Sequence, residues 1–123
     1  MNKNKVTFIL HKPQLSENIG ACARAIKNFD FQKLYLIDPK PIFPNDKILA
    51  TSVGAKDIIK KSKVFNNLES SLGDIDILIA TSARFRNKNV KHINLEGLKK
   101  IDFGKKIGFL FGSEASGLSN KEV

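Results

Sequence analysis

Four short apolar runs limit the folds that are open to this chain of 123 residues. Each run is nearly continuous rather than alternating with polar residues, and each is rich in apolar β-formers; they are Val6–Leu10, Leu34–Ile37, Ile75–Ala80 and Ile107–Phe111. Continuous runs of this length predict strands that are buried on both faces of a sheet. Helical segments stand between the runs. The sequence therefore predicts an α/β fold, with a mostly parallel sheet and helices on both faces.

The predicted helices begin at residues that are common N-caps. Ser16 precedes an amphipathic stretch that ends before Asp30, with apolar residues three or four positions apart. Asn66 and Glu69 have the spacing of a capping box, which predicts a short helix ending near residue 73. The other predicted elements are a proline-rich loop over 38–44, a helix over 46–53, a helical turn over 57–61, a very short strand over 64–65 and a helix over 95–101.

Polar and glycine-rich segments follow three of the predicted strands, at residues 11–18, 81–86 and 112–118. The carboxyl ends of parallel strands meet at one edge of a sheet, where ligands bind in open α/β folds. We therefore expect these three segments to converge on one site.

The charge of the chain is strongly positive and unevenly spread. There are 21 Lys and Arg residues against 12 Asp and Glu, a formal net charge of +9. Residues 1–63 hold twelve of these cations and five of the anions. Two explanations stay open: a nucleic-acid partner bound by the N-terminal half, or a surface solvated mainly by lysine.

Other classes of protein are excluded or disfavoured by the composition. No apolar stretch approaches the roughly 18–20 residues that a membrane-spanning helix needs. Cys22 is the only cysteine and there is no cluster of Cys and His, so neither a disulfide nor a zinc site is predicted. The expectation is one cytoplasmic domain over residues 1–123, without metal and without membrane contact.

Arginine is rare in this lysine-rich chain, occurring only at Arg24, Arg84 and Arg86. Its planar guanidinium binds a phosphate through two parallel hydrogen bonds, which lysine cannot do. The three arginines are therefore candidates for phosphate recognition, and the alternative is that they occupy solvated surface positions.

Four segments together resemble the SPOUT superfamily of knotted RNA methyltransferases. Asn18–Arg24 resembles its first motif, N-x-G-x-x-A-R, and residues 110–120 resemble its second, F-G-x-E-x-x-G-L-x-N. Gly54 with Ala55, and residues 81–84, are similar to further landmarks of the branch that contains the TrmJ-type tRNA 2′-O-methyltransferases. The resemblance runs in order from about residue 6 to the last residue.

The resemblance implies methyl transfer from S-adenosylmethionine to a ribose 2′-hydroxyl of tRNA or rRNA. By motif position, Thr81, Ser82, Ala83 and Gly112 would line the adenosylmethionine pocket. The transfer requires an oxygen aligned for in-line attack and no metal.

The resemblance also implies roles for four residues near the RNA. Arg24 would lie at the reacting hydroxyl or the neighbouring phosphate, where it would position and stabilise charge, because a guanidinium is a poor general base. Asn18 and Glu114 would pair to hold the loops and shape the RNA entrance, and Arg84 would help to bind the substrate. The family is described as dimeric with composite sites, so a homodimer with Arg24 acting across the interface is expected.

The family pattern continues with a third motif that threads the trefoil knot and closes the cofactor pocket. Residues 1–123 do not contain that motif. A capping box at 119–122, which ends one residue before the last residue of the sequence, predicts that a helix begins there. For these residues alone we expect an incomplete knot, exposed apolar surface and weak or absent adenosylmethionine binding. Two other functions stay open: a non-catalytic RNA-binding protein derived from such an enzyme, and a generic nucleotide-binding domain.

Overall fold

The computed structural model describes residues 3–80 and 104–112, and in them the chain forms a five-stranded sheet. The strands lie in the order β3-β2-β1-β5-β4, and every neighbouring pair among them is parallel. Their bounds are β1 Val6–His11, β2 Lys33–Ile37, β3 Lys63–Phe65, β4 Ile77–Ala80 and β5 Ile107–Phe111. The predicted parallel sheet is confirmed.

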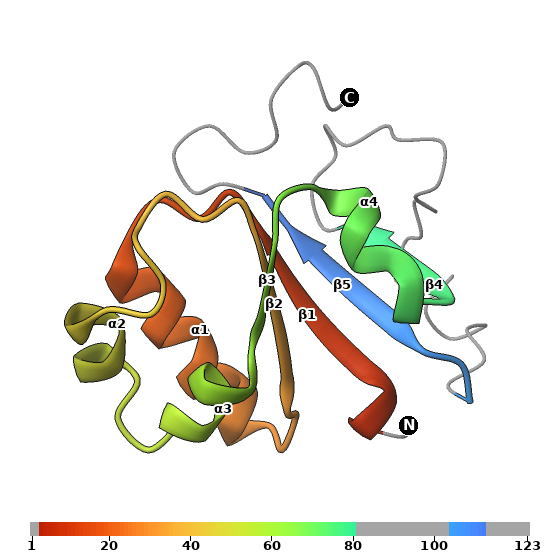
Figure 1. Ribbon diagram of the computed structural model, residues 1–123. Coiled ribbons are helices and arrows are strands. Elements are labelled where there is room, and N and C mark those ends of the chain that lie inside the picture. Colours follow the sequence, from red (N-terminus) through yellow and green to blue (C-terminus); the bar gives the residue numbers. More distant parts are fainter. Residues whose placement is uncertain (1–2, 81–103, 113–123) are drawn as a thin grey trace.

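Helices cover both faces of this sheet (Figure 1). On one side lie α1 (Ser16–Asn28), α2 (Asp46–Thr51) and α3 (Lys56–Lys61), and on the other lies α4 (Leu68–Ser71), followed by the 3-10 helix η2 (Leu72–Asp74). A further 3-10 helix, η1 (Lys3–Lys5), leads into β1. Within the described ranges no helix has the length and apolar character needed to cross a bilayer.

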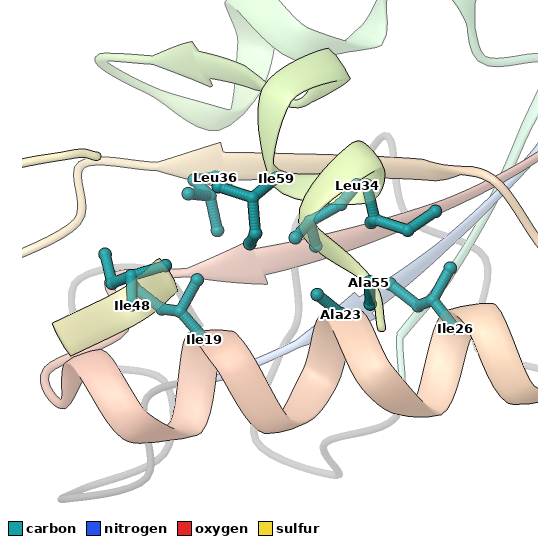
Figure 2. Packing of buried hydrophobic residues seen from close by; sticks show 9 residues of the cluster. Ile19, Ala23, Ile26, Leu34, Leu36, Ile48, Ala55 and Ile59 are labelled. Carbon is teal, nitrogen blue, oxygen red and sulfur yellow. The ribbon is translucent and has the colours of Figure 1, made fainter. Parts of the chain in front are cut away.

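Two apolar clusters, one on each face, explain why the strand sequences are continuous apolar runs. Under α1, side chains of β2 pack against the first three helices (Figure 2); this cluster comprises Ile19, Ala23, Ile26, Leu34, Leu36, Ile48, Ala55, Ile58 and Ile59. Under α4 a second cluster comprises Ile9, Tyr35, Ile37, Leu68, Leu78 and Leu110. Successive residues of a strand point to opposite faces, so both sets of positions must be apolar.

The start of α1 differs from the prediction by one residue. Ser16 is the first helical residue, and Leu15 occupies the N-cap position without any side-chain cap. The Ser16 hydroxyl instead accepts a hydrogen bond of 3.1 Å from the side-chain amide of Asn45, the residue that caps α2. The hydroxyl therefore joins the two helix starts rather than capping its own helix.

The cap of α4 is likewise displaced by one residue. Asn67, not Asn66, is the N-cap, and its side-chain oxygen accepts a 2.9 Å hydrogen bond from the backbone amide of Ser70. This start places Leu68 in the core, where it is 8% exposed. The other predicted elements agree with the structure within two residues at each end. The helix predicted over 95–101 lies outside the described residues.

Candidate functional site

The strands that precede the three predicted site segments are neighbours in the sheet. β5 lies between β1 and β4, with Phe111 paired to Leu10 and Leu110 paired to Ala80. Their carboxyl ends are therefore level at one edge (Figure 1). The expected convergence is confirmed for the strand ends.

Gly112 is the predicted cofactor residue that the structure describes. It follows β5 directly, is half-buried, and so occupies the middle of the three strand ends. Ligands of parallel sheets bind at such a carboxyl edge. The remaining predicted site residues at this edge lie outside the described residues: Thr81, Ser82, Ala83, Arg84 and Glu114.

Backbone hydrogen bonds fix the turns that follow β1 and β2 at the same edge. The amide of Lys12 donates to the carbonyl of Ile37 at 2.7 Å, and the amide of Lys40 donates to the carbonyl of Pro13 at 2.9 Å. Lys12 adopts a positive φ of 52°, a conformation that costs energy for a residue with a side chain. These bonds hold the segment that leads into α1, and Asn18 lies exposed in its first turn.

Arg24 lies on the outer face of α1, in a shallow depression of about 130 Å³. Lys27 and Asn28 line it from the same helix, and the turn at residues 53–55 lines it from the opposite side. Gly54 in that turn has a φ of +79°, which favours glycine. The structure therefore brings the segment Asn18–Arg24 next to Gly54 and Ala55, which the sequence could identify only as separate landmarks.

A single chain does not bring Arg24 to the strand ends. The helix α1 begins at the carboxyl edge with Ser16, and at 1.5 Å per residue Arg24 lies about 12 Å further along its axis. The role of Arg24 at the reacting hydroxyl stays a prediction, and the carboxyl edge that Arg24 would serve need not be that of its own chain.

Lys27 forms an ion pair, whereas Arg24 does not within the described residues. The Lys27 ammonium donates to the Asp57 carboxylate at 2.8 Å, and this hydrogen bond holds the pKa of Asp57 below its ordinary value. Among residues 3–80 and 104–112 no carboxylate pairs with Arg24. The guanidinium is thus available to an anion. Sequence reasoning missed Lys27 and Asn28, although their spacing of three and four from Arg24 predicts a shared helix face.

An apolar depression of about 380 Å³ lies between α1 and the sheet. Its lining consists of aromatic and aliphatic side chains together with the thiol of Cys22. Phe29 is one of these lining residues, and it is 69% exposed. Cys22 lies in this lining, and burial raises the pKa of its thiol to about 11.

We expect Cys22 to react slowly with iodoacetamide at pH 8, because only the thiolate is nucleophilic. With a pKa of about 11, the thiolate fraction at that pH is roughly 100-fold smaller than in an unfolded chain. The rate should rise about tenfold per pH unit up to pH 10 and become normal in urea. A plateau in the rate below pH 9 would contradict this assignment.

Comparison with known proteins matches this chain to a family over nearly its whole length. The SpoU rRNA Methylase family matches residues 5–123. The tRNA (cytidine-2′-O-)-methyltransferase TrmJ of Methanocaldococcus jannaschii is 33% identical over 123 residues, which cover 96% of this chain and 53% of that protein. The uncharacterized tRNA/rRNA methyltransferase LasT of Escherichia coli K12 is 38% identical over 125 residues, which cover 97% of this chain and 54% of that protein.

Solved structures agree with the sequence comparisons. A probable methylase family protein from Haemophilus influenzae superposes with a TM-score of 0.80 at 31% identity, covering 98% of this chain and 52% of that one. TrmJ from Z. mobilis ZM4 superposes with a TM-score of 0.78 at 29% identity, covering 95% of this chain and 53% of that one. The chain spans about half the length of the curated relatives it matches. It belongs to the SpoU methylase family.

Proposed function

We propose that the full gene product containing residues 1–123 transfers a methyl group from S-adenosylmethionine to a ribose 2′-hydroxyl of tRNA. The observation that carries this proposal is the similarity to TrmJ proteins along nearly the whole chain. The structure supports it by joining the segment Asn18–Arg24 to Gly54 and Ala55 in one depression. The names of these relatives favour tRNA over rRNA, and a cytoplasmic location suits that substrate.

Adenosylmethionine is proposed to bind at the carboxyl ends of β1, β5 and β4. Gly112 fits this place because it follows the central strand and adds no side chain to the edge. Thr81, Ser82 and Ala83 remain predicted partners on the adjacent strand end. The cofactor supplies a methyl group activated by a sulfonium. A protein of the same fold, AviRb from Streptomyces viridochromogenes, was crystallised with AdoMet.

Arg24 is proposed to complete the site of a second chain in a homodimer. Its guanidinium faces outward, and its position along α1 separates it from the strand ends of its own chain. The pKa of a guanidinium is too high for a general base, so its role is to hold a phosphate and stabilise negative charge on the attacking oxygen. Asn18, Glu114 and Arg84 are proposed to shape the RNA entrance.

The proposal is tested by methyl incorporation into unmodified tRNA transcripts from radiolabelled adenosylmethionine. Nuclease digestion should release one 2′-O-methylated nucleotide, and a transcript with a 2′-deoxy residue at that position should accept no label. An rRNA fragment of equal length is the control for RNA class. Binding of tRNA without any transfer in the presence of bound adenosylmethionine would instead establish the non-catalytic RNA-binding function.

A further inference from the structure

Among the described residues, most of the positive charge at the strand ends lies at the edge of the sheet opposite the candidate site. The segments that lead into the five strands, residues 3–5, 30–33, 60–63, 74–76 and 104–106, hold eight lysines and three aspartates, a net charge of +5. The described segments that follow the strands, residues 11–15, 37–40, 65–67, 80 and 111–112, hold two lysines and one aspartate. Half of the twelve cations in residues 1–63 lie at this amino edge, together with Lys105 and Lys106.

A groove of about 240 Å³ gathers three of these lysines on the α4 face of the sheet. Lys33 begins β2 and Lys63 begins β3, while Lys61 ends α3. Since Lys63 is paired with Tyr35, which lies two residues after Lys33, the two strand lysines point to the same face. The Lys63 ammonium lies 5.9 Å from the centre of the Tyr35 ring, which forms part of the groove lining.

The positive charge of this groove is poorly balanced. Asp74 is its single acidic lining residue, and its carboxylate lies 3.5 Å from the Tyr35 hydroxyl. Within the described residues neither Lys33 nor Lys61 makes a side-chain hydrogen bond or an ion pair. Three ammonium groups beside one carboxylate repel one another, and a polyanion bound in the groove relieves that repulsion.

We propose that the groove formed by Lys33, Lys61 and Lys63 binds the phosphate backbone of the RNA substrate, away from the site of methyl transfer. The identity of the RNA rests on the proposed function. Lysine ammonium groups act as flexible point charges, so the contact holds phosphates without reading bases. With a rise of about 3.3 Å per residue, strands of this length separate the two sheet edges by about 15–20 Å. The groove therefore contacts phosphates several nucleotides from the methylated ribose.

The test compares two double variants that each remove two positive charges. Lys33→Gln with Lys61→Gln alters the groove, and Lys40→Gln with Lys56→Gln alters exposed lysines outside its lining. Binding of unmodified tRNA to the full gene product is measured without adenosylmethionine along a KCl series. The groove pair should reduce the slope of log affinity against log salt by about 1.5, and lower the affinity about tenfold near 0.1 M salt.

The outcomes separate this proposal from the proposed function. If the two double variants lose affinity equally, or if neither does, the groove is not an RNA site. Loss of binding to anionic phosphatidylglycerol vesicles without loss of tRNA binding would also overturn it in favour of a membrane contact. Lys33→Arg with Lys61→Arg keeps both positive charges and should therefore bind tRNA as tightly as the unaltered protein does. A groove-dependent tRNA affinity without methyl transfer would refute only the proposed function.

Discussion

Replacing Arg24 with alanine is expected to lower the rate of methyl transfer to tRNA by a factor of about 100 to 1,000. That range is typical for the loss of one group that stabilises charge in a transition state. The fold should be unaffected, because Arg24 is exposed and the ion pair that joins α1 to α3 is made by Lys27 and Asp57. Lys56→Ala, which removes an exposed cation from α3, is the matched control and should retain full activity.

The kinetic parameters and a mixing experiment show how Arg24 acts. A guanidinium that stabilises the attacking oxygen should affect kcat, whereas one that only binds tRNA should affect KM. Arg24→Ala mixed with an inactive Gly112→Val variant should recover up to about a quarter of the activity if the site is shared between two chains, because half the dimers are mixed and each has one intact site. No recovery would place Arg24 in the site of its own chain. Full activity of Arg24→Ala alone would remove it from the site.

The sequence predicts the strands of this fold well, because a strand that is buried on both faces of the sheet needs apolar residues at nearly every position. Leu36 faces the α1 cluster and Ile37 faces the α4 cluster, so the run over 34–37 contains no polar position. Helix starts are harder to locate, because a capping side chain has alternative partners. Ser16 accepts a hydrogen bond from Asn45, which lies 29 positions further along the chain. A tertiary contact of this kind takes the place of a local cap.

The arrangement of the site depends on the order of the strands, which no local pattern encodes. The strand at 107–111 lies between those at 6–11 and 77–80, and this order makes the three site segments neighbours. The approach of Arg24 to Gly54 follows from the packing of α1 against the turn between α2 and α3. Similarly, the lysines of the amino edge are scattered in sequence and become one surface only when the strands align in parallel.

Replacing Gly20 with alanine is expected to destabilise the protein by about 2–3 kcal/mol, the upper part of the range for overpacking a core. Gly20 is buried in the Asn18–Arg24 segment, where α1 meets α2. A Cβ atom at this position would lie 2.8 Å from the backbone carbonyl carbon and the Cβ of Thr51, and would also collide with its hydroxyl. That hydroxyl is held by hydrogen bonds of 2.8 Å to the Lys47 carbonyl and 3.2 Å to the Ile48 carbonyl.

The sign of the stability change in Gly20→Ala shows whether packing against Thr51 or helix propensity dominates at this position. In a helix interior alanine is normally about 1 kcal/mol more favourable than glycine, so propensity alone predicts that Gly20→Ala stabilises the protein. Gly73→Ala is the matched control, since no atom lies within 4 Å of the added methyl group, and it should leave stability nearly unchanged. Thermal unfolding should show a decrease of roughly 10 °C for Gly20→Ala.

A double-mutant cycle with Thr51→Ala identifies the colliding partner. Removing the Thr51 hydroxyl should recover part of the stability lost in Gly20→Ala, giving a coupling of about 1 kcal/mol between the two positions. Absence of coupling would mean that the methyl group is accommodated by moving α1 as a whole. If Gly20→Ala keeps its full stability but loses methyl transfer, then this glycine serves a ligand rather than the contact between α1 and α2.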